Sequence, residues 1–162
     1  MIIGHGDIAS VLPDREDLLF FASGVSNSGE TRESEYDREL NLLMAQNKSS
    51  HIVYFSSLAI LERDTRYTRH KRAMEAQVKF NFGHYCIVRL GNIDWGTNPH
   101  TFINYLREHP EAEIKDEYRY VVDRDEFLYW IGKIPTWSCE LSIPGRRLKV
   151  QEVVDEYITE RK

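Results

Sequence analysis

The stretch "IIGHGDIA" (Ile2–Ala9) decides the fold, because it joins a short apolar run to a turn with two glycines. Gly4, Gly6 and Ala9 match the pattern G-x-G-x-x-G/A, which follows a strand and opens a helix in dinucleotide-binding domains. There the first glycine makes the tight turn, the second lets a pyrophosphate approach the backbone, and the small third residue lets the helix pack closely. A glycine-rich turn that binds nothing has the same letters, so this stretch alone leaves both interpretations open.

The segment after this turn is shorter than a complete dinucleotide fold requires. Such a fold places a second strand after the first helix, with an acidic residue about 20 residues beyond the glycines. Here "SVLPDRED" (residues 10–17) leads straight into "LLFFASG" (residues 18–24), with room only for a very short helix beginning near Asp7. We therefore expect the second and third strands to be missing, together with most of the adenosine site.

Strand-length apolar runs alternate with amphipathic helical patterns along the rest of the chain. The patterns predict strands at 1–3, 17–25, 51–60, 85–93 and 118–123, a strand or turn at 139–145, and helices at 33–49, 66–81, 98–110 (starting near Pro99), 124–135 and 149–162. This alternation predicts a single domain over residues 1–162. Its fold class is α/β, a Rossmann-like three-layer α/β/α arrangement around a truncated, mainly parallel sheet.

Composition narrows the classes of function. The chain of 162 residues is 41% hydrophobic and has a net charge of −5, which opposes general attraction to nucleic acid or to an anionic membrane. Its apolar runs are too short to span a bilayer and its start has no secretory pattern, so we expect a cytoplasmic protein. Cys86 and Cys139 stand far apart in the sequence, without metal-ligand spacing, and the histidines also lack such spacing, so no metal site is expected.

Tyr67 and Lys71 are spaced for chemistry on one helix face. Residues at i and i+4 lie one turn apart, and an ammonium favours the charged form of a neighbouring phenol. Lys71 would then bring the pKa of Tyr67 toward a value useful for proton transfer, while Ser57, at the end of the preceding strand, hydrogen-bonds the same substrate oxygen. The alternative is that Tyr67 packs its ring and Lys71 is a solvated charge.

A basic run accompanies this pair on the same predicted helix. It could bind phosphate groups or an acidic partner, or it could be a solvated helix paired with the acidic segment "ETRESEYDRE" (residues 30–39). The second interpretation is the simpler one. The residues of the run are Arg63, Arg66, Arg69, His70, Lys71 and Arg72.

An ordered series of segments resembles the extended short-chain dehydrogenase/reductases, the NAD-dependent epimerase/dehydratase family that acts largely on nucleotide sugars. After "GHGDIAS" (residues 4–10), the segments that carry the resemblance are "FFASGVSNS" (20–28), "IVYFSSLAIL" (52–61), "YTRHKRAMEA" (67–76), "CIVRLGNIDWG" (86–96) and "ELSIPGRRLKVQEVVDEYI" (140–158). The chain looks like a shortened member, with Ile60 and Leu61 where the family has Val-Tyr and "DWG" where Tyr-Gly-Pro is common.

The resemblance implies a role for each matched residue. Tyr67 would be the catalytic acid/base, Lys71 would bind the nicotinamide ribose, and Ser57 would orient the substrate oxygen. The residues implied to line an NAD or NADP site are Gly4, Gly6, Ala9, Ala22, Ser23 and Gly24, with Arg89 and Asn92 beside a nucleotide-sugar substrate.

Two functions from different classes remain open on the sequence. The first is an NAD(P)-dependent oxidoreductase, epimerase or dehydratase acting on a nucleotide sugar. The second is a catalytically degenerate Rossmann-fold protein that binds a nucleotide or a partner, with cofactor binding weak or lost. In the resembling family, the helices around 36–45 and 67–78 commonly form a dimer interface, so a homodimer is expected.

Overall fold

The computed structural model describes residues 1–158, and its main sheet has five parallel strands in the order β1-β2-β3-β4-β7. The bounds are β1 Ile2–Ile3, β2 Leu19–Phe21, β3 His51–Ser57, β4 His84–Leu90 and β7 Cys139–Ile143. β1 is an edge strand that pairs only with β2, in the register Ile2↔Phe20 and Ile3↔Phe21. Among residues 1–158 no strand pairs with the outer edge of β1. This mainly parallel, truncated sheet confirms the predicted fold class.

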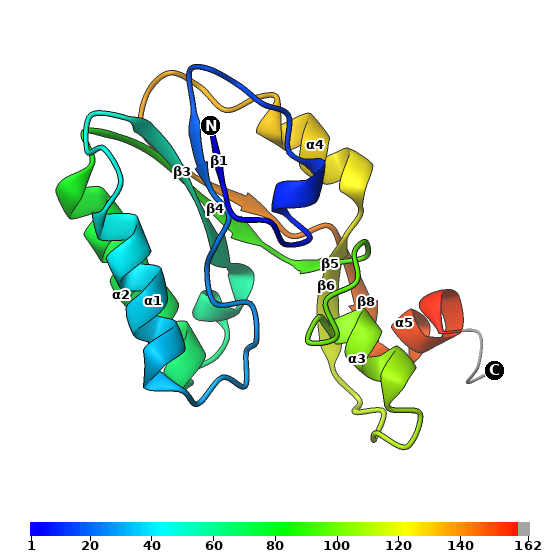
Figure 1. The fold of residues 1–162 in the computed structure, drawn as a ribbon. Coiled ribbons are helices and arrows are strands. Elements are labelled where there is room, and N and C mark those ends of the chain that lie inside the picture. The colour runs from blue at the N-terminus through cyan, green and yellow to red at the C-terminus, as the bar shows by residue number, and fades with distance from the viewer. Residues whose placement is uncertain (159–162) are drawn as a thin grey trace.

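Helices cover both faces of the main sheet (Figure 1). On one face, α1 (Glu33–Met44) and α2 (Arg66–Asn81) lie side by side, and on the other lie the 3-10 turn η1 (Ala9–Val11) and α4 (Arg124–Ile131). Alternate side chains of each strand supply the two cores. Phe20 belongs to the same core cluster as Phe127 of α4, whereas Phe21 belongs to that of Met74 on α2. Burial on both faces explains why β2, β3 and β4 are mostly apolar.

A second, small sheet has three strands in the order β5-β6-β8, with α3 and α5 packed against it. Its elements are β5 Asn92–Ile93, α3 Phe102–Glu108, β6 Tyr118–Val122, β8 Arg146–Lys149 and α5 Val150–Tyr157. Figure 1 shows this part beside the main sheet, on the side where β3 and β4 end. Its core is made by side chains from all of these elements except β5, among them Ile103, Leu106, Val121, Leu148 and Val153.

Several predicted elements differ in the structure. The strand predicted at 85–93 is interrupted at Gly91, after which β5 joins the small sheet. The strand predicted at 51–60 ends at Ser57 and continues as the 3-10 turn η2 (Leu58–Leu61). The helix expected near Asp7 is only the three-residue η1, and the one expected from Pro99 begins at Phe102.

Two further features were not predicted. β8 was missed, because its sequence "RRLK" is almost wholly polar and the strand lies at the edge of a small sheet. Cys86 and Cys139, far apart in the sequence, are register partners on β4 and β7, with their Sγ atoms 3.5 Å apart as free thiols. The last part of the predicted closing helix, residues 159–162, lies outside the described residues. Within residues 1–158, no helix is long and apolar enough to cross a membrane.

Candidate functional site

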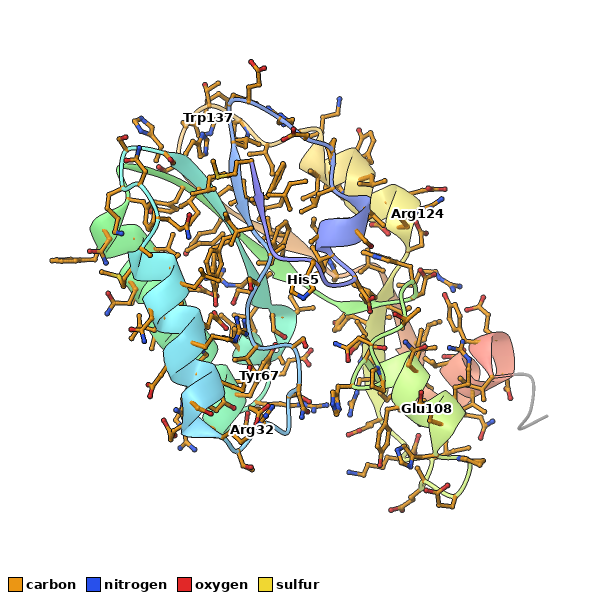
Figure 2. All side chains as sticks on the ribbon, viewed as in Figure 1. His5, Arg32, Tyr67, Glu108, Arg124 and Trp137 are labelled. Carbon is orange, nitrogen blue, oxygen red and sulfur yellow. The ribbon has the colours of Figure 1, made fainter. Side chains whose placement is uncertain are left out.

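A pocket of about 1320 Å³ lies at the carboxyl ends of the main-sheet strands and reaches the small sheet. Its walls include the glycine turn after β1, the loop after β2, the end of β3 and the segment after β4. In open parallel sheets this edge is where ligands bind, because several loops converge there. Figure 2 labels two residues of the pocket, His5 in the glycine turn and Tyr67 on α2.

The glycine turn has the backbone that its sequence indicates. Gly4 has a φ of +117°, and a Cβ there would lie 2.3 Å from the Ala22 carbonyl oxygen, so only glycine fits. Gly6 borders the pocket, and a Cβ there would meet no atom within 4 Å. Ala9 is buried in η1 behind the turn. With three residues, η1 offers an anion far less helix dipole than a full helix does.

Asp7 joins the glycine turn to the segment after β5. Its Oδ1 accepts a hydrogen bond from the Thr97 amide at 3.0 Å, and its Oδ2 accepts one from the Asn98 amide at 2.9 Å. Its backbone oxygen accepts a third from Trp95 Nε1 at 3.0 Å. The carboxylate, which would repel a phosphate in the turn, is therefore neutralised in part by two amides of the opposite wall.

Asp7→Ala should lower the free energy of unfolding by about 1–3 kcal/mol, because two amides lose a charged acceptor. Urea denaturation measures this change. Asp14→Ala is the matched control, since Asp14 is exposed and forms an ion pair with the exposed terminal ammonium, at 3.4 Å. Its effect should stay within about 0.5 kcal/mol. Equal midpoints for the two variants would show that the Asp7 contacts contribute nothing to stability.

Ser57, Tyr67 and Lys71 all border the pocket, as the sequence analysis expected of a site. Ser57 ends β3, and its Oγ accepts a hydrogen bond from the Ala59 amide at 3.1 Å. Tyr67 lies in the first turn of α2, which Thr65 caps by accepting from the Thr68 amide. Lys71 follows one turn later, with its Nζ 5.7 Å from the centroid of the Tyr67 ring.

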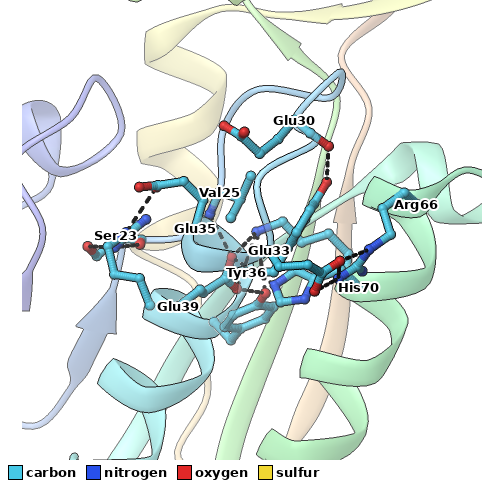
Figure 3. Close-up of polar contacts among 12 residues, drawn as sticks. Ser23, Val25, Glu30, Glu33, Glu35, Tyr36, Glu39, Arg66 and His70 are labelled. Carbon is cyan, nitrogen blue, oxygen red and sulfur yellow. Dashed lines mark hydrogen bonds and ion pairs between the residues drawn. The ribbon is translucent and has the colours of Figure 1, made fainter.

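The Lys71 ammonium is paired with Glu39, which belongs to the acidic segment of residues 30–39 but was not singled out in it. Lys71 Nζ donates to Glu39 Oε1 at 3.1 Å and also contacts Tyr54 OH at 3.4 Å. Figure 3 shows Glu39 among its polar partners, one of which is the Val25 amide at 2.6 Å. Lys71 is 2% exposed and its nearest charge is Glu39, so the alternative in which Lys71 is a solvated charge is wrong. The effect of Lys71 on Tyr67 stays a prediction.

Lys71 and the hydrogen-bond donors around Glu39 lower the pKa of its carboxyl by more than burial raises it. Burial by itself would raise the pKa of this carboxyl, but Lys71, His70, Tyr54 and the Val25 amide together hold the pKa well below its usual range. The pKa of Lys71 is likewise raised, since Glu39 more than offsets the burial that would lower it. Both groups are thus charged, and the pair carries no net charge.

The loop after β2 brings three of the predicted cofactor residues to the pocket wall: Ala22, Ser23 and Gly24. Arg38 of α1 donates to the Ser23 backbone oxygen at 3.0 Å and to its Oγ at 3.3 Å. A Cβ on Gly24 would lie 2.6 Å from Lys71 Nζ, so the loop backbone covers the ammonium closely.

The two predicted substrate residues are placed differently. Asn92 of β5 borders the pocket, and its Nδ2 donates to the Tyr120 backbone oxygen at 2.9 Å. Arg89 does not border it, because its guanidinium binds Glu75 at 2.6 Å on the α2 side of the sheet. Glu75 also accepts from Ser56 Oγ at 2.6 Å. The structure therefore brings Asn92, but not Arg89, to the other predicted residues.

Part of the pocket comes from residues that the sequence analysis did not single out. The small sheet and its helix contribute an aromatic and basic wall, formed by Phe102, Tyr105, Lys115, Arg119 and Tyr120. Arg119 stacks its guanidinium 5.2 Å from the centroid of the Phe102 ring. No local motif marks this wall. Its aromatic and cationic side chains could have indicated a binding surface only if the second sheet, which brings them together, had been predicted.

The basic run on α2 is largely paired, as the simpler interpretation held. Arg66 binds Glu33 of α1 at 2.8 Å, and Arg72 approaches Asp64 at 3.6 Å. The first of these contacts ties the basic helix to the acidic one beside it. Across residues 1–158, no cluster of three or more His, Cys, Asp or Glu side chains is arranged to hold a metal ion.

The sequence matches no protein-family model and no curated protein. Solved structures with a similar fold include a dTDP-4-dehydrorhamnose reductase from Clostridium acetobutylicum, at TM-score 0.61 and 12% identity, and a UDP-N-acetylglucosamine 4-epimerase from Bacillus cereus, at TM-score 0.60 and 15% identity. Each match covers 86% of this chain and 61% of the other.

A third similar structure is the Bordetella bronchiseptica enzyme WbmG in complex with NAD and UDP, at TM-score 0.57 and 14% identity. The match covers 86% of this chain and 55% of that enzyme. This chain thus spans 55–61% of the length of these three structures. At these identities the likeness establishes a shared Rossmann-like fold, in a group of structures that includes nucleotide-sugar epimerases and reductases.

Proposed function

We propose that the protein binds a nicotinamide nucleotide and a nucleotide sugar in this pocket and acts as an oxidoreductase or epimerase. The observation that carries the proposal is the meeting of Ser57, Tyr67, Lys71 and the glycine turn in one pocket, at the carboxyl ends of the strands. These residues come from three separate segments, β3, α2 and the turn after β1. A chance helical spacing of Tyr67 and Lys71 would not bring Ser57 and the glycine turn to the same place.

The residues present fit part of the cofactor. Gly6 leaves open space beside the turn, where a pyrophosphate can approach the backbone, and the loop at Ala22–Gly24 forms the neighbouring wall. In the part of the chain that the structure describes, no strands lie beyond the edge strand β1 to hold adenosine. We infer that the cofactor is contacted mainly at its pyrophosphate and nicotinamide ends. The residues that form or support this wall are Gly4, Gly6, Ala9, Ala22, Ser23 and Gly24.

A bound nicotinamide would supply hydride transfer. The chain's own part is to orient the substrate and to move one proton. Tyr67 would give or take the proton of the substrate hydroxyl, and Ser57 would hydrogen-bond the same oxygen. Asn92 and the aromatic and basic wall would hold the rest of the nucleotide sugar. Arg89 is given only a supporting role, through Glu75 and the end of β3.

Titration with NAD(H), NADP(H) and a panel of sugar nucleotides, followed by calorimetry or fluorescence, tests the proposal. We expect saturable but weak binding of the dinucleotides, because the adenosine strands are missing, and poor discrimination between NAD and NADP. Submicromolar, strongly selective binding would contradict the predicted lack of an adenosine site. Absence of binding to every nucleotide in the panel would overturn the proposed function itself.

The second candidate is a degenerate Rossmann-fold protein that binds a nucleotide or a partner without turnover. Two observations favour it: Asp7 places a carboxylate within the glycine turn, and Lys71 is already paired with Glu39. Binding without any turnover across the same panel would select this candidate.

We also infer a homodimer through α1 and α2, on which Met44 is 40% exposed and Phe80 is 88% exposed. Light scattering tests that inference directly.

A further inference from the structure

The pair of Glu39 and Lys71 is built across three elements. Glu39 comes from α1, Lys71 from α2, and Tyr54, which contacts both, from β3. Glu39 is 0% exposed and Lys71 is 2% exposed. Taking two charges out of water is costly, and such a pair is retained only where the geometry satisfies both groups.

Glu39 also holds the wall of the pocket. Its Oε1 accepts from the Val25 amide at 2.6 Å and from Lys71 Nζ at 3.1 Å. One carboxylate oxygen thereby joins the backbone of the loop after β2 to the ammonium beneath it. Gly24, next to Val25, borders the pocket and lies directly over Lys71 Nζ. Glu39 itself does not border the pocket and cannot touch a ligand there.

We propose that Glu39 is a positioning residue: its carboxylate fixes the Lys71 ammonium in the pocket wall and joins it to the backbone of the loop after β2. This inference rests on the proposed function, in which Lys71 faces the nucleotide. Glu39 acts through Lys71 and the loop. With Glu39 beside it, Lys71 presents a fixed positive charge. Without Glu39, burial would favour the neutral form of the lysine.

The groups around Lys71 determine what the loss of Glu39 does. Among residues 1–158, Glu39 is the one carboxylate that raises the pKa of Lys71. Removal of its charge leaves burial as the dominant effect on the lysine, and burial lowers the pKa. With Glu39 present, Lys71 therefore keeps its proton at pH values above the ordinary lysine pKa. Without Glu39, it loses the proton at pH values below that pKa. The other titratable groups that face the pair are Tyr54 on β3, Tyr67 and His70 on α2, and Arg38 on α1.

Lysine-Cε NMR on the complete chain tests the inference. The Lys71 signal is assigned by its absence from Lys71→Arg, and its titration is followed in the wild type and in Glu39→Gln. We expect Lys71 to titrate above 10.5 in the wild type and clearly below 10.5 in the variant. An unchanged Lys71 titration in folded Glu39→Gln would overturn the inference.

Tyr54→Phe is the matched control. It removes the hydroxyl that contacts both charges but leaves the carboxylate and the ammonium in place. Lys71 should therefore stay charged in this variant, and a drop as large as that in Glu39→Gln would assign the effect to the tyrosine. If Glu39→Gln does not fold, Glu39→Gln/Lys71→Met decides: recovery of folding supports Glu39 as the counter-ion, and failure to recover contradicts it.

Nucleotide affinity separates this inference from the proposed function. NADH should bind Glu39→Gln about tenfold more weakly than the wild type, the loss expected for one hydrogen bond from a charged group. Tyr54→Phe should bind NADH as the wild type does. If the wild type binds neither NADH nor any other nucleotide of the panel, the proposed function fails, and the Lys71 titration still decides the role of Glu39.

Discussion

Replacing Lys71 with methionine should lower the free energy of unfolding by about 3–5 kcal/mol, because it leaves the Glu39 carboxylate buried without a cation. Glu39 is 0% exposed, so water cannot take over from the ammonium without opening the packing between α1 and α2. Methionine is close to lysine in length and fills the same space, which keeps the loss of packing small. Chemical denaturation followed by circular dichroism measures the change.

The double variant Lys71→Met/Glu39→Gln separates charge from packing. Glutamine keeps an oxygen that can accept from the Val25 amide, so the variant removes the two charges and preserves that hydrogen bond. Its stability should recover most of the loss, since replacing both members of a buried pair is often close to neutral. If the double variant is as unstable as Lys71→Met alone, the methionine disturbs packing and the charge argument fails.

The pair of Lys71 and Glu39 shows which part of the site could be predicted from the sequence and which part could not. Helical spacing placed Tyr67 and Lys71 on one face, and the structure confirms the helix with the predicted bounds, Arg66–Asn81. Spacing within one helix does not give the partner from the next. Glu39 lies in the apolar stripe of α1, between Tyr36 and Leu43, and a charge in that stripe was the signal that could have revealed it.

The centre of the main sheet was predictable because β2, β3 and β4 are largely buried on both faces and therefore mostly apolar. The small sheet was not, because β5 has two residues and β8 is exposed and polar, so neither has a readable pattern. Cys86 and Cys139 illustrate the same limit: their contact follows from the pairing of β4 with β7, a register that no local signal specifies. The aromatic and basic wall of the pocket was missed for the same reason.

Tyr67→Phe should reduce turnover of a nucleotide sugar by about 10²–10⁴-fold, the usual contribution of a positioned acid or base. Nucleotide binding should be almost unchanged, because the ring remains and only the hydroxyl is lost. Within residues 1–158 that hydroxyl makes no hydrogen bond to the protein, so the variant should also keep its stability. The expected signature is a fall in kcat with a nearly constant dissociation constant for NADH.

Tyr129→Phe is the matched control for this prediction. Tyr129 lies on α4, 57% exposed and outside the pocket, so the same chemical change there should leave both turnover and binding as they are. Steady-state kinetics on the two variants, at several pH values, decides the outcome. If Tyr67→Phe retains the wild-type rate, Tyr67 does not move the proton. The meeting of Ser57, Tyr67 and Lys71 in one pocket would then support binding alone, which is what the degenerate candidate requires.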